Sequence, residues 1–240
     1  MTEKKQRIVS QIRGYSERGI VNSITYFLND NPEHIYAFIE TLGIHLEKCN
    51  YNFTFLIEQS FYAFGDSDLV IIANNGKKKT VIFIECKVKT YQGTFKIESE
   101  FKKIKNAIDI NEKTDGISSN LFVQLYNKHL LIDTKGGSSN DSAVKGISKK
   151  HKEKIPKKLG GNEIVHKAFK EVKDASDYYY VAITPEKMDN EKFRDKINKL
   201  ELMPSENAYL CDWENIENYL EKVKATKVLE MFEYNKGQIY

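Results

Sequence analysis

The chain has 240 residues, of which 40% are hydrophobic and 30% are charged, the ordinary balance of a soluble globular protein. Its cysteines, Cys49, Cys86 and Cys211, are odd in number and widely spaced, which excludes a disulfide framework and a zinc knuckle. No apolar stretch approaches the roughly 18–20 residues of a membrane span, and none follows the N-terminus as in a signal peptide, so we expect a cytoplasmic protein without a membrane partner.

The N-terminal part of the chain is predicted to be helical. Residues 2–14 are compatible with a short helix. A second helix, over 16–28, is predicted by a polar cap at Ser16 and by apolar residues at helical spacing, namely Ile20, Ile24, Phe27 and Leu28. Glu17 stands three residues before this stripe, so its side chain should point along the buried side of the helix.

A further helix and the first strand are expected next. The pair Asn31-Pro32 predicts the start of a helix that runs to about Lys48. Its inward side is expected to consist of Ile35, Phe38, Ile39 and Leu42. Residues 51–62 read as the strand that leads into a hairpin.

The most informative pattern is that hairpin. Two apolar, β-branched runs, 66–73 and 80–88, flank an Asn-Gly turn. A four-residue loop over 75–78 would place Asp68 directly opposite Glu85, with Cβ atoms about 4.5–5.5 Å apart. A slip of one residue would undo this pairing, so the prediction depends on the length of the turn.

The hairpin would gather two carboxylates and a lysine. Lys87 lies two residues beyond Glu85 and should therefore share its face of the strand. Two facing carboxylates among apolar residues repel each other unless a cation lies between them, and Mg²⁺ favours such oxygen ligands together with substrate phosphate. A neighbouring lysine can orient or deprotonate a water and neutralise charge on a phosphorane-like transition state. The trio therefore predicts a phosphodiesterase site.

The second half of the chain alternates helices and strands. One segment, 119–133, is apolar and compatible with either a strand or a helix. The other predicted elements are helix 95–110, strand 178–183, helix 190–200, strand 208–211 and helix 213–223, the last capped by Asp212.

Asp68 followed by Glu85-x-Lys87 on the next strand resembles the motif of the PD-(D/E)xK nuclease superfamily, to which many restriction endonucleases belong. The resemblance covers roughly residues 15–110, and Ser67 stands where the name of the family has proline. It implies an α/β fold with a restriction-endonuclease-like core, in which helices flank a central mixed sheet as α/β/α layers. Residues 1–240 would then form a single domain with its C-terminal half over 111–240.

The resemblance also implies roles for further residues. The main-chain carbonyl of Cys86 is expected to be a third metal ligand beside Asp68 and Glu85. Glu17 corresponds to an acid that many members supply from a helix ahead of the hairpin, where it would assist a second metal or orient Lys87. Gln92, with the helix over 95–110, resembles the glutamine-bearing helix that many members place behind the metal site.

Alternatives stay open at several of these positions. A D…ExK string can also be surface charge. Asp66 would lie on the same face as Asp68 and competes with it as the metal ligand, although the expected register favours Asp68. Glu17 is equally compatible with an acid favoured by the helix dipole. Glu58 and Glu40 are weaker candidates for the same role.

A basic segment stands apart from the hairpin. The net charge is only +3, but residues 136–160 begin with a Gly- and Ser-rich stretch and then carry seven lysines. These are Lys145, Lys149, Lys150, Lys152, Lys154, Lys157 and Lys158. They are suited to contacts with a phosphate backbone, although a solvated surface loop explains the same composition. Side chains that read bases are expected in this C-terminal half.

Together these features predict a Mg²⁺-dependent endonuclease that hydrolyses double-stranded DNA, with Mn²⁺ able to substitute. A type II restriction enzyme or a related defence nuclease is the first expectation, and cutting both strands would require a homodimer. The alternatives are a structure-selective repair or junction nuclease, a nuclease acting on RNA, and a non-catalytic nucleic-acid-binding module with the same fold.

Overall fold

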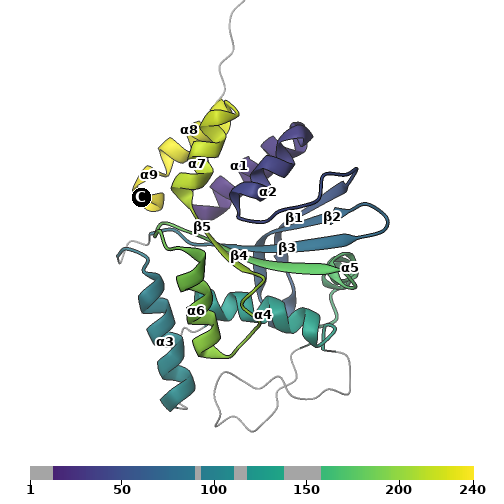
Figure 1. The fold of residues 1–240 in the computed structure, drawn as a ribbon, viewed down its shortest axis with the longest axis vertical. Coiled ribbons are helices and arrows are strands. Elements are labelled where there is room, and N and C mark those ends of the chain that lie inside the picture. The colour runs from purple at the N-terminus through teal and green to yellow at the C-terminus, as the bar shows by residue number, and fades with distance from the viewer. Residues whose placement is uncertain (1–12, 90–92, 111–117, 138–157) are drawn as a thin grey trace, which may run out of the picture.

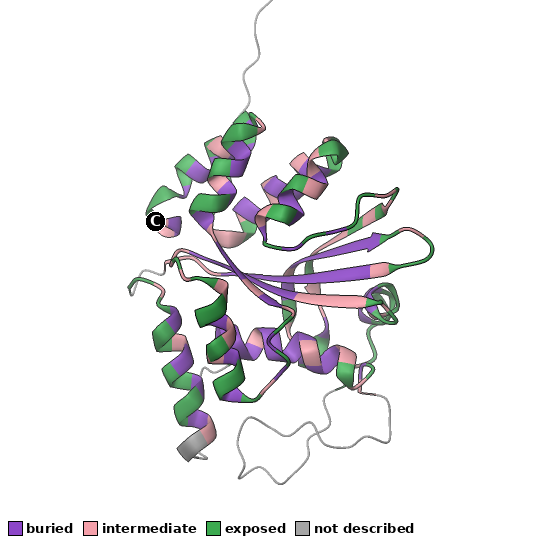
Figure 2. Cartoon of the chain, in the orientation of Figure 1, coloured by how far each residue is buried: buried purple, intermediate pink, exposed green. Residues whose placement is uncertain are grey.

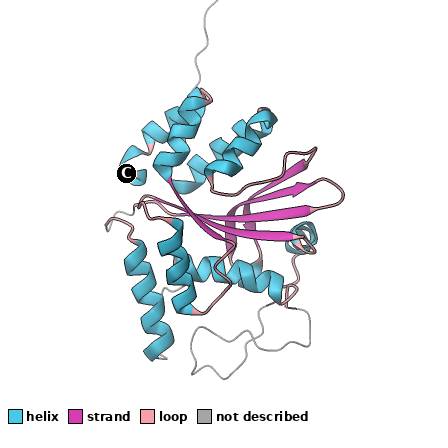
Figure 3. Ribbon diagram, viewed as in Figure 1, coloured by secondary structure: helices cyan, strands magenta, loops and turns pink. Residues whose placement is uncertain are grey.

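The computed structural model describes residues 13–89, 93–110, 118–137 and 158–240 (Figure 1). At its centre is one sheet of five strands in the order β1-β2-β3-β4-β5, with the strands drawn in magenta in Figure 3. These strands are β1 (Asn52–Ser60), β2 (Asp66–Asn74), β3 (Lys79–Cys86), β4 (Asp177–Thr184) and β5 (Ala208–Asp212). The first three pair in antiparallel fashion, whereas β4 runs parallel to β3 and β5 runs parallel to β4. The predicted α/β class with a central mixed sheet is therefore confirmed.

The β2–β3 hairpin has the predicted register. Its pairing runs from Asn74 opposite Lys79 to Leu69 opposite Ile84, so the loop between the strands is the expected four residues, 75–78. Two features close this loop: the Asn75 side chain accepts hydrogen bonds from the backbone of both following lysines, and Gly76 has a φ of 83°. Left-handed backbone of this kind favours glycine because there is no Cβ to clash.

Five α-helices and a short 3-10 helix cover one face of the sheet (Figure 1). They are α1 (Ser16–Asp30), η1 (Pro32–His34), α2 (Ile35–Thr41), α7 (Trp213–Lys222), α8 (Thr226–Tyr234) and α9 (Lys236–Ile239). Their apolar sides form one core with the odd-numbered residues of β2 and the even-numbered residues of β3, including Ile71 and Ile82. Both termini of the described chain therefore lie on this face.

The opposite face is covered by α3 (Ile97–Ile110), α4 (Leu121–Asp133) and α6 (Asn190–Leu200), and α5 (Glu163–Val172) closes the same core. The helix α4 packs on β3, β4 and the short 3-10 helix η2 (Tyr62–Phe64), and most of its length is buried. The side chain of Asn120 caps it by accepting from the N–H groups of Phe122 and Val123. Figure 2 shows the consequence, since β3 is buried on both faces along nearly its whole length.

Two predictions about helices need correction. The 16–28 helix is present, but its N-cap is Tyr15 rather than Ser16, whose N–H instead donates to the side chain of Asn235 at 3.1 Å. The helix predicted to run to about Lys48 ends at Thr41, because Gly43 turns the chain with a φ of 85°. Its inward residues, Ile35, Phe38, Ile39 and Leu42, are nevertheless buried.

The remaining elements follow the sequence pattern closely. The ambiguous segment 119–133 is helical, as α4. The helix α6 and the Asp212-capped α7 begin where predicted, at residues 190 and 213. The predicted helix over 2–14 falls largely outside the described residues.

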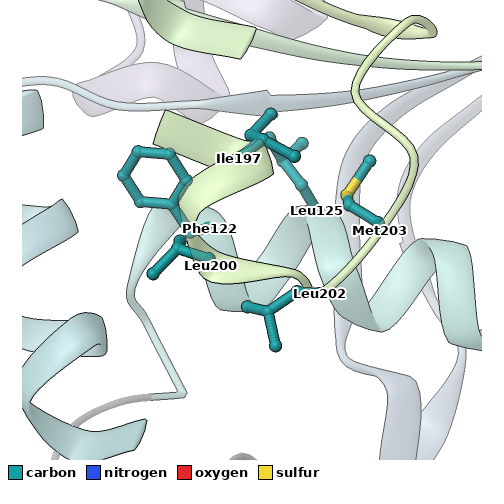
Figure 4. Close-up of a pocket in the computed structure, with 6 residues that line it drawn as sticks. All are labelled: Phe122, Leu125, Ile197, Leu200, Leu202 and Met203. Carbon is teal, nitrogen blue, oxygen red and sulfur yellow. The ribbon is translucent and has the colours of Figure 1, made fainter. Parts of the chain in front are cut away.

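A seam of apolar side chains joins α4 to α6 and the segment that follows α6. Figure 4 shows these side chains, which are Phe122, Leu125, Ile197, Leu200, Leu202 and Met203. They leave a void of only about 10 Å³, less than one ordered water needs, so the seam is core packing rather than a ligand site. Within the part of the chain that the structure describes, no helix is both long and apolar enough to span a bilayer.

Candidate active site

The predicted acids and lysine meet where β2 begins and β3 ends. The regular pairing stops at Leu69–Ile84, one residue short of Asp68 and Glu85. There the carboxylate of Asp68 accepts a hydrogen bond from the backbone N–H of Cys86, with an Oδ2–N distance of 2.6 Å. The side chain of Asp68 is thus hydrogen-bonded to the last residue of β3, beside Glu85, in agreement with the expected arrangement.

The environment of Asp68 disfavours its ionised form. Burial is the largest cause and the charge of Glu85 the second, and together they raise the pKa of Asp68 to about 7. The Cys86 N–H and the Lys87 ammonium act in the opposite direction, but they do not outweigh the first two. Among the described residues, Asp68 has no counter-ion that compensates it fully. This is expected of a carboxyl group that is arranged to bind a cation.

Glu85 already has a partner for one of its two oxygens. Its Oε1 lies 3.0 Å from Nζ of Lys128, and both side chains are almost completely inaccessible. The hydroxyl of Ser67 is a weaker donor to the same oxygen, at 3.4 Å. The second oxygen, Oε2, is buried and has no hydrogen-bond partner among the described residues. An unpartnered carboxylate oxygen in the interior is costly, so this atom marks a place for a missing donor or cation.

Lys128 is fixed by more than Glu85. Its ammonium group also donates to the main-chain carbonyls of Phe64, at 3.2 Å, and Asp66, at 3.0 Å. These three acceptors match the three N–H donors of a lysine side chain. Lys128 therefore ties α4 to η2, to the start of β2 and to Glu85, and it holds Glu85 in one orientation.

Lys87 is held from three sides. Its N–H donates to the carbonyl of Ile183 on β4 at 2.8 Å, and its carbonyl accepts from the indole of the buried Trp213 at 2.8 Å. Its ammonium group donates to the side-chain oxygen of Gln124 on α4. The backbone and the amine of the predicted catalytic lysine are therefore both positioned by the surrounding fold.

The contacts to α4 follow from matched spacing. Glu85 and Lys87 are two residues apart on a strand, about 6.6 Å along its axis. Gln124 and Lys128 are four residues apart on a helix, about 6 Å along its axis and on one side of it. One turn of α4 can thus contact both strand residues at once, through the Lys87–Gln124 and Glu85–Lys128 pairs.

Glu17 lies at the same end of the sheet, half-buried near the start of α1. Its charge is close enough to contribute to the raised pKa of Asp68. The start of α1 is fixed by Asn235, whose side chain bonds the N–H of Ser16 and the carbonyl of Gly14. At Gly19 a Cβ would come within 2.6 Å of the Gly14 backbone, so only glycine permits this close turn. Asn235, the cap residue between α8 and α9, thereby positions the turn of α1 that carries Glu17.

Cys86 serves the site through its main chain. Its side chain belongs to the core on the α1 face, and burial raises the pKa of the thiol well above its usual value, so the thiol is not a nucleophile. The backbone N–H is the group that orients Asp68. The predicted role of the Cys86 carbonyl as a metal ligand stays a prediction.

The rival acids make other contacts, although the β1–β2 register places Glu58 across from Asp68. The side chain of Asp66 is exposed, and only its main-chain carbonyl contacts the site, through Lys128. Glu58 forms an ion pair with Arg18 at 3.7 Å. Glu40 is near His45 at 3.8 Å, on α2. Geometry therefore favours Asp68 over Asp66.

Two residues of the site were missed by the sequence reading. Gln92 lies outside the described residues, and the glutamine that contacts Lys87 is Gln124, on α4 rather than on α3. Lys128 was not singled out at all. A signal was present, since Gln124 and Lys128 stand four residues apart among the polar residues that interrupt the apolar run of 121–131. Their shared side can be recognised only once the segment is known to be a helix.

The predicted phosphate contacts are largely outside the described structure. Lys145, Lys149, Lys150, Lys152, Lys154 and Lys157 all fall on residues that the structure does not describe. Lys158 is described and exposed. Gly136, just before the segment that the structure does not describe, packs against Leu159, just after it. The two flanking described stretches therefore lie close together.

The donor set fits a hard divalent cation. In the described ranges, no three His, Cys, Asp or Glu side chains converge as a metal-binding group. Mg²⁺, however, commonly takes only one or two protein carboxylates and keeps several waters. The unpartnered Oε2 of Glu85 and the carboxyl of Asp68, with its raised pKa, supply such a pair.

Comparisons of the chain with protein-family models, with curated proteins and with solved structures find no match. What the site can do is therefore inferred from its own residues.

Proposed function

We propose that this chain is a divalent-metal-dependent nuclease of the PD-(D/E)xK type, with a restriction-endonuclease-like core, which hydrolyses DNA phosphodiester bonds. One observation carries the proposal: the buried Oε2 of Glu85 is unpartnered next to Asp68, whose pKa is raised to about 7. Lys87 is held beside these two acids. Two neighbouring acids that can hold a divalent cation, with a fixed lysine beside them, would form the machinery of phosphodiester hydrolysis.

Each residue has a role that follows from its contacts. Asp68 and Glu85 would hold Mg²⁺ or Mn²⁺, with the Cys86 carbonyl as a further donor, and the bound ion would supply Lewis-acid chemistry and a more acidic water. Lys87 would orient the attacking water and neutralise charge that develops on the phosphate oxygens. Glu17 would orient Lys87 or assist a second ion.

Two residues of α4 support this machinery. Gln124 fixes the direction of the Lys87 amine, and Lys128 fixes Glu85 through Oε1, which would leave Oε2 available to the metal. Neither group needs to contact substrate. Their function is to keep the reacting groups in one geometry, on which catalytic rates depend strongly.

The substrate and the assembly are part of the same proposal. We take double-stranded DNA as the substrate, contacted by the lysines of 145–158, and a homodimer as the active form, because cutting both strands requires two sites. The biological role that suits these features is a type II restriction enzyme or a related defence nuclease.

Cleavage of plasmid and long linear DNA with Mg²⁺, and with EDTA in its place, tests the activity. We expect Mg²⁺-dependent fragments with the wild-type protein, and loss of cleavage in Lys87→Ala with DNA binding retained. Discrete fragments would support the restriction role, whereas cleavage confined to branched DNA or to RNA would move the proposal to a structure-selective or RNA nuclease.

A pair of neighbouring acids provides a matched control. Asp68→Asn removes the proposed metal ligand, while Asp66→Asn makes the same chemical change two residues away on an exposed side chain. Activity should disappear in the first variant and persist in the second. Equal activity in both variants, or full activity in Lys87→Ala, would reject the assignment.

A second candidate is a nucleic-acid-binding module that has this fold but no catalysis. One observation favours it: Lys128 already neutralises Glu85 without any metal. Absence of divalent-ion binding together with retained DNA binding would select this alternative.

A further inference from the structure

A polar cavity lies away from the candidate active site. It has a volume of about 250 Å³ and lies between the C-terminal half of α4, the start of β4 and the turn that precedes β5. The residues that line it include His129 and Asp133 of α4, Tyr178 and Tyr180 of β4, and Glu206 of the turn. Since β3 and β4 are parallel, the start of β4 is at the opposite end of these strands from Lys87.

The charge around this cavity is negative. Asp133, Asp177 and Glu206 line it, and no lysine or arginine of the described ranges does, in a chain whose net charge is +3. Asp177 is paired with Lys78, at an Nζ–Oδ2 distance of 2.7 Å. Asp133 and Glu206 form no ion pair within the described part of the chain, so two carboxylates at the rim remain uncompensated.

The wall of the cavity is aromatic. The ring of Tyr180 stacks on Phe83, with centroids 5.9 Å apart and planes 8° apart. The ring of His129 stands edge-on to Tyr180 at 5.9 Å. Burial lowers the pKa of His129, so the imidazole is neutral near pH 7 and adds no positive charge. Neutral aromatic faces next to uncompensated carboxylates attract cations.

The side chain of Tyr180 brings a hydroxyl to the cavity. Tyr180 is only 4% exposed and lines the cavity, and its hydroxyl makes no hydrogen bond with any described residue. Its neighbour differs, since the hydroxyl of Tyr178 donates to Val172 at 3.1 Å and accepts from Ala175 at 2.8 Å. The Tyr180 side chain is thus almost fully buried while its hydroxyl is left accessible in the cavity, where it can bind a polar group.

We propose that this cavity binds an organic cation with N–H donors, that is, the guanidinium or ammonium head of a basic side chain or of a free polyamine. The rim carboxylates of Asp133 and Glu206 would pair with the charge, the rings would pack on it, and the Tyr180 hydroxyl would accept one N–H. The volume is below the roughly 300–1,000 Å³ of sites for drug-sized molecules, which suits a head group.

Binding is tested by NMR titration of the full chain with four probes: N-acetyl-arginine amide, its neutral analogue N-acetyl-citrulline amide, spermidine and tetramethylammonium. Saturable shifts at the cavity with arginine amide or spermidine, absent with the citrulline analogue and weaker with tetramethylammonium, are expected. Tighter binding of spermidine would identify a free polyamine, and tighter binding of arginine amide a protein side chain. Equal binding of the citrulline analogue, or no saturable shift with either cation, would overturn the proposal.

Two cavity variants and two controls define the contacts. Neutralising the rim with Asp133→Asn and Glu206→Gln should weaken binding about tenfold or more, because hydrogen bonds to charged groups are the strong ones. Tyr180→Phe keeps the stacked ring and should weaken binding several-fold. Glu201→Gln changes an acid outside the cavity and should leave binding unchanged, as should Lys87→Ala. Unchanged affinity in both cavity variants would contradict the assignment, whatever the outcome of the nuclease assays.

Discussion

Two lysine–carboxylate pairs stand at opposite ends of the β2–β3 hairpin. At the turn, Lys78 pairs with Asp177 at 2.7 Å, and both side chains are at least a third exposed. At the other end, Lys128 pairs with Glu85 at 3.0 Å, and neither side chain is more than 1% exposed. The distances are similar but the surroundings are not. Water screens the attraction between the charges of the first pair. In the second pair, each charged group has lost its hydration and has the other group in place of water.

The contrast distinguishes an exposed ion pair of little consequence from a buried ion pair at the candidate active site. An exposed pair stabilises a fold by little, so its loss is tolerated. A buried pair is costly to form, and wherever one occurs with an oxygen still unpartnered, as at Glu85, a functional reason is worth testing. Four substitutions and changes of condition can break or sharpen this comparison.

The largest effect is expected from Lys128→Met. Removing one partner leaves Glu85 as a buried, uncompensated charge, which costs about 3–5 kcal/mol of the free energy of unfolding. Urea denaturation followed by circular dichroism measures it. Adding Glu85→Met should recover most of the loss, because the uncompensated charge is gone. A loss below about 1 kcal/mol in Lys128→Met would show that the pair is not buried as described.

Gln124→Ala should act on activity rather than on stability. The substitution frees the Lys87 amine, and a misplaced catalytic group commonly costs about 10–100-fold in rate. The expected result is a lower kcat for DNA cleavage with unchanged KM and unchanged Mg²⁺ affinity. An unaltered kcat would mean that Gln124 does not position Lys87.

The pKa of Asp68 predicts how stability depends on pH without metal. Because its pKa is about 7 when folded and about 3.9 when unfolded, the folded protein binds an additional proton between these values. This contribution to stability is present at low pH and is lost as pH rises through 7. Asp68 is partly exposed, so about 1–2 kcal/mol is a reasonable size for the effect. Urea midpoints in EDTA at pH 5 and pH 8 should reveal the slope in the wild type and a smaller one in Asp68→Asn, and equal slopes would contradict the assignment.

The smallest effect is expected from Lys78→Met, which removes the exposed pair. The cost should be about 0–1 kcal/mol, and it should shrink further in high salt. The same urea experiment measures it beside Lys128→Met. A cost as large as that of the buried pair would erase the distinction between the two ends of the hairpin.

Much of the fold could be predicted from the sequence because the local signals for turns and helix caps were strong. The Asn-Gly turn with its flanking β-branched runs determined the register, and with it the position of Asp68 relative to Glu85. The Asp212 cap marked the start of α7. The failures came where distant contacts override local ones: Ser16 looked like a cap, but its N–H is bound by Asn235, more than two hundred residues away.

The candidate active site could be predicted from the sequence only in part. Spacing within one hairpin could bring Asp68, Glu85 and Lys87 together, because a strand pair has a fixed geometry. The contributions of Gln124 and Lys128 depend on how α4 lies across the sheet, which no local pattern specifies. The support that Trp213 gives to Lys87 comes from still further along the chain, through the packing of α7.

The central claim is that Asp68 and Glu85 hold a divalent cation, and calorimetric titration with Mg²⁺ tests it most directly. The wild-type protein and Asp66→Asn should bind the ion with similar affinity, while Asp68→Asn and Glu85→Gln should bind it weakly or not at all. Absence of binding in the wild type, or equal binding in Asp66→Asn and Asp68→Asn, would contradict the claim.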